Sequence, residues 1–541
     1  MIDPEDDRGL PPRRGAGAFF ARHSFSIVAA AAAALSLGLA LRGLTRQPIW
    51  LDEAYAIAVA RQPLSAIAPS LADESGPPLY YWILHGWIAL FGDGAAAVRA
   101  LSVVCGVLLV PATALLGRRL AGARSGLAAA WVIAASPMVV QFSQETRMYT
   151  LLPLLTALSA ERLAAVVQKG GARRIACYAL LLAATLYTHN WGLLLLPALA
   201  VAALVLARPG GDSAGSSGRL PPGRSSRDAL RDAFLGTAAA LAIYAPWLPI
   251  VRSQAGALSY LFIGMVQKLP AWQLPFRSLV LFGSGVGTTG GEAKSLLPGA
   301  GGPLLAAAWG CLILAALRDR SFRRAGTAML AMASIPLAAA AFYGVVRRPI
   351  YLVGRYELIV LPFFVVLVTG GAATLLRGRS FAVLVTLWAA MLVLLTLGYT
   401  AKPQRRFAEP ELAARLAPEL REGDRIVFTG LYRAAMEYHL RRAGARFEPA
   451  SFPPDVALHL GWFYDDLYHL DDPALLEAAR ADCPAAGRRT WVVASGARTC
   501  RLLLERLSTC ARITTPLAAQ GPPSNLLLLA EPAGSPPPLL K

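Results

Sequence analysis

The sequence has little charge for its length. Asp, Glu, Lys and Arg make up 16% of the 541 residues, whereas 55% of the residues are hydrophobic and the mean hydropathy is +0.48. Soluble globular domains carry about 25% charged residues, so this composition excludes an ordinary soluble protein. The apolar residues form repeated long runs. The chain is therefore predicted to be a polytopic α-helical membrane protein whose first partner is the lipid bilayer.

Acidic residues are scarce relative to basic ones. Asp and Glu number 33 and Lys and Arg number 52, which gives a formal net charge of +19. Such an excess can indicate nucleic-acid binding, but here the basic residues form short clusters between apolar runs. That distribution is typical of loops at an anionic membrane face. Nucleic acid is not an expected partner.

Cysteine is scarce as well, with six residues in the chain. Three lie in apolar runs, where they are interpreted as small core residues, and three lie in the polar C-terminal part: Cys105, Cys177 and Cys311, and Cys483, Cys500 and Cys510. The second group allows one disulfide at most, and the sequence leaves open which two cysteines pair. No Cys or His cluster completes a metal site, so neither a metal nor another cofactor is expected.

Eleven apolar runs approach the roughly 20 residues that a helix needs to cross a bilayer. The first follows an N-terminus without a convincing small-residue cleavage site, so it is predicted to be an uncleaved span. The predicted spans are residues 24–45, 95–117, 125–142, 150–168, 174–189, 191–207, 233–251, 302–317, 326–346, 357–376 and 380–400.

Basic loops determine the predicted orientation. With the N-terminus in the cytoplasm, every inner loop is basic, as the positive-inside rule requires, and the opposite orientation breaks the rule almost everywhere. The inner loops contain Arg118, Arg119 and Arg124; Lys169, Arg173 and Arg174; Arg318, Arg320, Arg323 and Arg324; and Arg377 and Arg379. The Gly-, Ser- and Pro-rich segment 208–232 also lies inside and is predicted to be a flexible cytoplasmic loop.

The remaining polar clusters then share the outer face, where we expect a functional site. They are residues 52–53, 73–74, 99, 144–149, 189–191 and 347–357. Beyond residue 400 the chain becomes soluble in character: RIVFTG and RTWVVASG are typical of buried strands, and AAMEYHLRRAG and SGARTCRLLLERL of helices. Residues 401–541 are predicted to form a small α/β domain on the same outer side.

The first outer loop, residues 46–94, carries the clearest signals. Asp52 and Glu53 follow the first span directly, within IWLDEAY. DEAYAIAVAR has apolar residues near helical spacing, and YYWILHGWIALF is a second apolar segment that Pro77-Pro78 precedes. Both patterns favour helices that lie in the membrane interface. Acidic residues at a helix start can also simply favour the helix dipole.

The order of several motifs resembles the bacterial protein mannosyltransferase-like group of GT-C glycosyltransferases, similar to glycosyltransferase family 39. The resemblance implies the GT-C fold for residues 1–400, a place in the bacterial cytoplasmic membrane, and a sugar donor carried on polyprenyl phosphate. It covers roughly the first 200 residues and a later segment, through LDEAYAIAVA, GPPLYYWILHGWIALFG, AAVRALSVVCG, SPMVVQFSQETRMYTLL, LYTHNWGLLLLPALA and YLVGRYELIVLPFF.

Matched residue by residue, the resemblance implies that Asp52 is the general base and Glu53 its catalytic neighbour. The chain departs from the family pattern at three positions. Gly76 stands where a histidine is common, Thr146 where alanine is common, and Asn190 where an aromatic residue is common. The glycine leaves acceptor recognition open, since the missing side chain would line the same cavity.

The chemistry of sugar transfer explains these residue types independently. A base must take the proton of the acceptor hydroxyl, and the leaving polyprenyl phosphate gathers negative charge. Fixed cations such as Arg147 and Arg355, with His189 as a hydrogen-bond donor, would stabilise that charge in a single inverting displacement without a metal. The other predicted substrate-binding residues are Glu74, Arg99, Glu145, Tyr149 and Tyr356. The acceptor is expected to be an extracytoplasmic glycolipid, polysaccharide or protein.

Ordinary explanations compete with these assignments. An interfacial arginine such as Arg147 can reach for headgroups, Arg99 can simply begin a span, and His189 can belong to an aromatic belt. The spacing of Asp465, Asp466 and His469 could suit a metal but is more typical of a solvated helix face.

Two other function classes remain open from the sequence. A transporter or flippase of lipid-linked sugars would also be basic and polytopic, although the internal repeats typical of transporters are missing here. A non-catalytic protein that binds envelope components through the outer domain is the second alternative.

Overall fold

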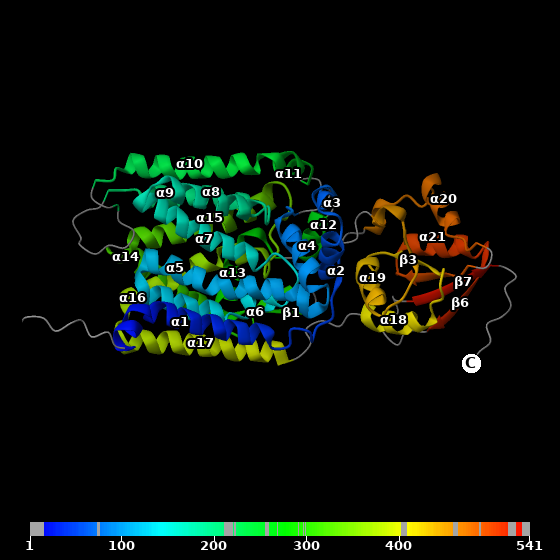
Figure 1. Cartoon of the computed structure of the whole chain (residues 1–541), viewed down its shortest axis with the longest axis horizontal. Coiled ribbons are helices and arrows are strands. Elements are labelled where there is room, and N and C mark those ends of the chain that lie inside the picture. Colours follow the sequence, from blue (N-terminus) through cyan, green and yellow to red (C-terminus); the bar gives the residue numbers. More distant parts are fainter. Residues whose placement is uncertain are drawn as a thin grey trace, which may run out of the picture.

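The computed structural model describes most of the chain from residue 16 to residue 532. The described residues are 16–72, 76–209, 220, 223–254, 259–267, 269–289, 292–295, 297, 299–401, 408–457, 464–485, 488–517 and 526–532. Figure 1 shows a long helical bundle with a separate α/β domain at one end.

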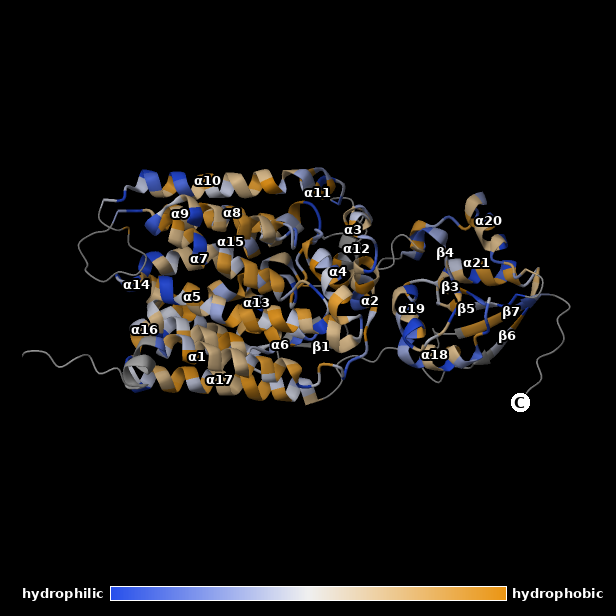
Figure 2. Cartoon of the chain, viewed as in Figure 1, coloured by the Kyte–Doolittle hydropathy of each residue, from blue (hydrophilic) through white to orange (hydrophobic). Residues whose placement is uncertain are grey.

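All eleven predicted spans are helical. They correspond to α1 (Ala16–Leu41), α5 (Ala95–Ala135) with α6 (Pro137–Ser143), α7 (Leu151–Lys169), α8 (Ala172–Leu186), α9 (Gly192–Leu206), α10 (Ser226–Tyr244) with α11 (Leu248–Gln254), α14 (Gly301–Arg318), α15 (Arg323–Val346), α16 (Leu361–Leu375) and α17 (Gly378–Ala401). Hydrophobic residues dominate these helices (Figure 2).

Fewer helices meet the criteria for a full span than the sequence predicts. Among the described residues, eight helices are long and apolar enough, or nine if the pair Ala123–Ala135 and Pro137–Ser143, bent by 55°, counts as one span. Helices α8 and α9 have 15 residues each, or about 22 Å, which is shorter than a hydrocarbon core of about 30 Å.

Glycine permits the sharp reversal inside α5, which accounts for two predicted spans. Gly122 breaks the helix with φ +87°, a conformation that disfavours other residues. The two arms then pack closely, because a Cβ on Gly117 would lie 2.7 Å from the Cα of Gly126. The two arms of α5 therefore form a helical hairpin within the bundle.

The basic loops gather at the end of the bundle opposite the α/β domain (Figure 1). Arg124 donates to the carbonyl of Leu376 at 3.3 Å, and Arg324 donates to that of Arg208 at 3.0 Å. The prediction of a flexible loop over 208–232 is partly wrong, because α10 begins at Ser226. The Ser225 hydroxyl caps this helix by accepting from the Asp228 amide. The stretch between, residues 210–219 and 221–222, lies outside the described residues.

The first outer loop forms helices, as predicted. They are α2 (Leu51–Ala60), α3 (Leu64–Ser70) and α4 (Leu79–Phe91). Helix α4 begins directly after Pro77-Pro78, since a proline without an N–H is tolerated there but not inside a helix. In Figure 1 the three helices lie across the end of the bundle that faces the α/β domain.

The sequence predicted no element between residues 251 and 302, and this was incomplete. That stretch contains α12 (Ser259–Val266), a 3₁₀ turn (Ala271–Gln273), α13 (Leu274–Ser284) and an antiparallel hairpin of β1 (Val286–Thr289) and β2 (Glu292–Ser295). Prolines interrupt the apolar runs here, so none reaches the length of a span.

The C-terminal domain is a three-layer α/β structure, as predicted. Its sheet has the order β4-β3-β5-β7-β6, with β3 parallel to β4 and β5, and β7 antiparallel to β5 and β6. The strands are β3 (Arg425–Thr429), β4 (Glu448–Phe452), β5 (Thr490–Ala494), β6 (Ala511–Leu517) and β7 (Leu526–Pro532), and the helices are α18 (Glu409–Leu416), α19 (Arg433–Arg442), α20 (Pro473–Ala481) and α21 (Arg498–Leu507).

The side chains of the strands alternate between the two faces of the sheet, and each face packs against its own layer of helices. Ile426 and Phe428 of β3 pack with α18 and α19, whereas Val427 between them packs with α20 and α21. Successive strand side chains point to opposite faces, so a strand that is apolar throughout requires cover on both sides.

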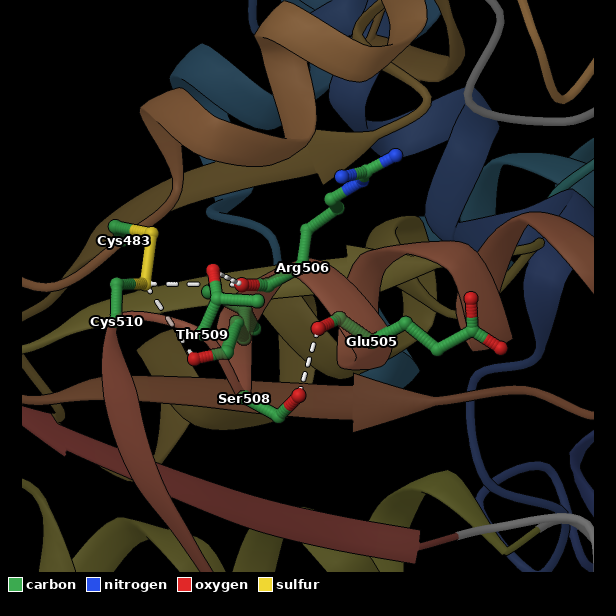
Figure 3. The surroundings of a disulfide bond; sticks show 7 residues. Cys483, Glu505, Arg506, Ser508, Thr509 and Cys510 are labelled. Carbon is green, nitrogen blue, oxygen red and sulfur yellow. Dashed lines mark hydrogen bonds between the residues drawn. A yellow bond between two sulfur atoms is a disulfide. The ribbon is translucent and has the colours of Figure 1, made fainter.

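The cysteines are only partly as expected. Cys483 and Cys510 form a disulfide between the end of α20 and the turn after α21 (Figure 3), and Cys500 is a buried free thiol. Cys105 is buried, as predicted, but Cys311 on α14 is exposed on the surface of the bundle. An apolar run in a membrane protein has a lipid-facing side, so membership of the run does not ensure burial.

Helix α19 docks the C-terminal domain onto the first outer loop. His439 Nε2 lies 2.9 Å from the carbonyl oxygen of Ile49, and Tyr438 Oη donates to the carbonyl of Asp93 at 3.1 Å. The Asp93 carboxylate pairs with Arg442 at 3.4 Å and also with Arg61. The domain therefore contacts the segment that leads into α2.

Candidate functional site

Asp52 and Glu53 have different partners although they are adjacent in sequence. Both lie in the first turn of α2, where consecutive side chains point about 100° apart. Asp52 Oδ2 contacts Nη1 of Arg355 at 3.0 Å, whereas Glu53 pairs with Arg99. The two carboxylates thus differ in their surroundings, since the Asp52 side chain is 21% exposed and that of Glu53 is fully buried.

The Glu53–Arg99 pair is buried, with both side chains at most 1% exposed. Arg99 donates from Nε and Nη2 to the two carboxylate oxygens at 2.8 and 2.6 Å, a bidentate geometry. Its Nη1 and Nη2 groups also donate to the carbonyls of Leu44, Gln47 and Pro48 at 2.7, 2.8 and 3.1 Å. Arg99 therefore does more than begin a span.

Glu53 also holds the loop that carries Arg147. Its Oε1 accepts from the backbone N–H of Thr146 at 2.9 Å and from the Thr146 hydroxyl at 3.1 Å. The threonine is one of the departures from the family pattern, and here its hydroxyl binds Glu53. With no exposed surface, Glu53 organises the site through its bonds to Arg99 and Thr146.

Asp52 lies between two arginines. Its side chain is 21% exposed and that of Arg355 is 17% exposed. Arg147 Nη1 lies 3.4 Å from the carbonyl oxygen of Asp52. The Nε of Arg147 is buried and makes no hydrogen bond within the described part of the chain. Arg147 and Arg355 therefore offer two guanidinium groups that an anionic group can bind.

Aromatic rings enclose these arginines. The Arg355 guanidinium carbon lies 5.7 Å from the centre of the Trp50 ring and 5.5 Å from that of Tyr149, and the Arg147 carbon lies 5.8 Å from the Tyr149 ring. These distances are within the range of cation–π contacts. Trp50, which the sequence analysis did not select, could have been found as the aromatic residue directly before LDE.

His189 and Tyr356 complete the cluster. Their ring centres lie 5.0 Å apart, and Tyr149 lies 6.5 Å from His189 and 6.2 Å from Tyr356. His189 Nδ1 accepts from the Trp191 backbone N–H at 3.1 Å, so Nε2 carries the proton of the neutral ring. Burial, and secondarily the charge of Arg147, lowers the pKa of His189 to about 3. A neutral donor thus lies beside the arginines.

Glu145 lines an adjoining polar pocket, and its charge also acts on Arg355. The pocket borders the Glu53–Arg99 pair, and Gln141, Gln144 and Trp50 also line it. Glu145 is 8% exposed. Glu74, another predicted site residue, lies with Asp73 outside the described residues.

The position of the expected histidine has room for a larger side chain. Among the described residues, which omit 73–75, a Cβ on Gly76 would meet the Met148 methyl carbon alone, at 3.9 Å. Gln254 Nε2 donates to the carbonyls of Leu71 and Gly76 at 2.8 and 3.4 Å, and Asn190 Nδ2 donates to Gln254 Oε1 at 3.1 Å. Asn190, a departure from the family pattern, therefore helps to hold this loop, and Gln254 was missed because it is remote in sequence.

The possible metal ligands in the outer domain have a structural role. Asp465 accepts from the N–H groups of Arg498 and Thr499 at 2.6 and 3.0 Å and so caps α21. The Asp466 side chain is 96% exposed. Among the described residues, no group of three or more His, Cys, Asp or Glu side chains is arranged to hold a metal ion.

Comparisons with known proteins agree with the predicted fold. Residues 75–214 match the family described as dolichyl-phosphate-mannose-protein mannosyltransferase. ArnT from Cupriavidus metallidurans in the apo state is 15% identical, with a TM-score of 0.58 over 94% of this chain and 98% of that chain. ArnT bound to undecaprenyl phosphate is also 15% identical, with a TM-score of 0.57 over 95% and 98%.

A more distant structure shares the architecture. The Archaeoglobus fulgidus oligosaccharyltransferase tethered to an acceptor peptide is 12% identical, with a TM-score of 0.51 over 88% of this chain and 70% of that chain. No protein in the comparison with curated sequences matches. The chain has the GT-C fold, and the resemblance to mannosyltransferase-like GT-C proteins is confirmed.

We expect Arg99→Met to destabilise the protein strongly, by about 3–5 kcal/mol, because the Glu53 charge would remain buried without its partner. The double variant Arg99→Met/Glu53→Gln removes that charge and should recover part of the loss. Thermal unfolding of the purified protein in detergent measures both. An Arg99→Met variant that unfolds at the wild-type temperature would contradict this account of the pair.

His189 should make stability depend on pH. Its pKa is lowered from 6.5 to about 3 in the folded protein, so below pH 6.5 the unfolded chain binds a proton that the folded chain does not. Stability is therefore complete above the unfolded pKa and falls as the pH drops, by up to about 1.4 kcal/mol per pH unit.

The check is the change in thermal midpoint between neutral pH and about pH 5, compared with His189→Gln, whose amide does not titrate. The wild type should lose more stability on acidification than this variant. Equal losses would show that His189 is not the group responsible.

Proposed function

We propose that this GT-C protein transfers a hexose or pentose from polyprenyl phosphate to an acceptor hydroxyl at the outer face of the cytoplasmic membrane. The observation that carries the proposal is the position of Asp52, which is partly exposed, contacts Arg355 at 3.0 Å, and has its backbone carbonyl 3.4 Å from Arg147. This arrangement combines a carboxylate base with an anion-binding surface.

The relatives support the class of donor. ArnT, which shares the fold over 95% of this chain, has been crystallised with undecaprenyl phosphate, and the oligosaccharyltransferase with an acceptor peptide. A phosphate on a long isoprenoid chain fits a positive site at the outer end of a helical bundle, because the lipid can stay in the bilayer while its phosphate reaches the arginines.

The proposed reaction is a single displacement. The acceptor oxygen attacks the anomeric carbon, the bond from that carbon to the phosphate oxygen breaks, and its electron pair stays on the leaving polyprenyl phosphate. Asp52 takes the proton of the acceptor hydroxyl. Attack from the face opposite the phosphate inverts the anomeric configuration.

Arg355, Arg147 and His189 would bind the leaving group. Arg355 also contacts Asp52, so one cation orients both the base and the phosphate. The two arginines neutralise the charge that develops, and neutral His189 donates through Nε2. The proposed mechanism needs no metal.

Two features support the outer orientation. The basic loops lie at the end of the bundle opposite the site, as the positive-inside rule expects for cytoplasmic loops. The C-terminal domain has the Cys483–Cys510 disulfide, and disulfides persist mainly in oxidising compartments outside the cytoplasm.

We expect Asp52→Asn to lose about 10²–10⁴-fold in turnover, since the amide cannot accept the proton. Mass spectrometry of polyprenyl-phosphate sugars compares cells that carry the wild type, Asp52→Asn or no copy. The loaded donor should accumulate equally in the mutant and the deletion strain, and its mass identifies the sugar.

The control is Asp466→Asn, the same change at a side chain that is 96% exposed, which should behave as the wild type. An unchanged carrier pool in both the Asp52→Asn and the deletion strain would contradict the transferase proposal and favour transport or envelope binding. Donor accumulation in the deletion strain alone would exclude Asp52 as the base.

The orientation predicts that Cys483 and Cys510 are oxidised in cells. In spheroplasts, a membrane-impermeant thiol reagent should label Cys483 and Cys510 of the folded protein only after reduction of the disulfide. The matched variant Cys483→Ser leaves Cys510 unpaired and should be labelled without reduction. Labelling that requires rupture of the inner membrane would place the domain in the cytoplasm.

A further inference from the structure

Glu357 is a fully buried carboxylate at the start of the span that includes α16, with 0% of its surface exposed. It lies two residues after Arg355, yet the proposed reaction gives it no part. A buried charge is costly unless hydrogen bonds satisfy it. The groups that Glu357 binds therefore indicate what it holds in place.

Both oxygens of Glu357 bind the turn before it. Oε1 accepts from the Gly354 N–H at 2.5 Å, and Oε2 accepts from the Arg355 N–H at 2.9 Å. Gly354 has φ +89°, a backbone conformation that other residues rarely adopt. This turn points two consecutive N–H groups at one carboxylate.

A second set of contacts ties the carboxylate to α13. Ser278 Oγ donates to Glu357 Oε1 at 3.0 Å and lies 2.8 Å from the Tyr351 hydroxyl. The Tyr351 ring packs edge-on against Trp191, with centres 5.1 Å apart. Glu357 thus connects the turn to two other parts of the bundle.

No regular element fixes Arg355. It has φ −138° and ψ −63° and precedes the 3₁₀ turn Tyr356–Val360 without a side-chain cap. The nearest backbone bond, from the Tyr356 N–H to the Leu352 carbonyl, is long at 3.4 Å. The position of the Arg355 backbone therefore depends on the two N–H bonds to Glu357.

We propose that Glu357 is a positioning residue for the transfer reaction. It holds the Gly354–Arg355 peptide so that the guanidinium reaches Asp52 Oδ2 and, on the proposed function, the phosphate of the donor lipid. Glu357 acts through the backbone and does not itself contact the substrate. This inference rests on the proposed function.

Glu357→Gln tests the proposal with little change of shape. The amide retains one acceptor oxygen, but in either orientation its NH₂ group would confront a backbone N–H, that of Gly354 or that of Arg355. We expect the affinity for undecaprenyl phosphate, measured by binding to the purified protein, to fall about 10- to 100-fold, because small displacements of a binding group are costly. The loaded donor should accumulate in cells.

Two variants separate positioning from general stability. Glu161→Gln changes another buried carboxylate, which lies on α7. The Glu161 side chain is 3% exposed and pairs with Arg119 at 2.5 Å. It should lower the thermal midpoint without lowering the affinity for undecaprenyl phosphate. Ser278→Ala keeps both backbone contacts of Glu357 and should give a smaller loss of affinity than Glu357→Gln.

The outcomes are distinguishable. Wild-type affinity in Glu357→Gln would overturn the inference, and so would an equal loss of affinity in Glu161→Gln, since the effect would then follow from instability. Full donor turnover in Asp52→Asn would contradict the proposed function itself. An inactive Asp52→Asn together with a Glu357→Gln variant of normal affinity and turnover would overturn the positioning role alone.

Discussion

The buried ion pair of Glu53 and Arg99 is the constraint on which the outer end of the bundle depends. It joins the first turn of α2 to the start of α5, and its remaining hydrogen bonds reach the carbonyls after α1 and the loop at Thr146. Because both charges are buried, the pair tolerates only a geometry in which each is satisfied. That requirement determines where α2 begins, and hence where Asp52 points.

Charge is concentrated where the apolar bundle ends. Asp52, Arg147 and Arg355 come from three segments that are far apart in the sequence, and aromatic rings cover the arginines. Partial burial strengthens electrostatic interactions, and the two guanidinium groups can bind an anionic ligand. The glycosyl-transfer proposal follows from these cations as much as from the carboxylate. Further from the centre, Glu357 and Gln254 hold backbone turns, so the site is supported mainly by buried polar side chains that bind main-chain groups.

The C-terminal domain belongs to the same arrangement. Helix α19 covers the segment before α2 through His439 and pairs with Asp93 through Arg442. A domain that packs on the loop carrying the proposed base restricts how that loop can move, and it also bounds the space from which an acceptor can arrive. Its two apolar sheet faces are each covered by helices of the domain itself. Its fold therefore does not rely on the bundle. The docking combines polar contacts with apolar packing of Ala434, Ala435 and Tyr438 against the core of the bundle.

Periodicity and composition by themselves determined the membrane character, the positions of the long apolar helices, and the α/β nature of the C-terminal domain, because burial in lipid or in a sheet leaves a regular apolar pattern. The order of short motifs likewise indicated the GT-C fold and the candidate residue Asp52. Tertiary structure alone decided that Glu53 faces Arg99, that Glu145 belongs to a neighbouring pocket, that Cys483 pairs with Cys510, and that Glu357 holds the turn at Arg355. Most of these contacts join residues that are remote in sequence. The different partners of Asp52 and Glu53 result from a rotation about the helix axis. Their partners are set by the packing of several helices at once, and a linear pattern records which side chains are polar but not which of them meet.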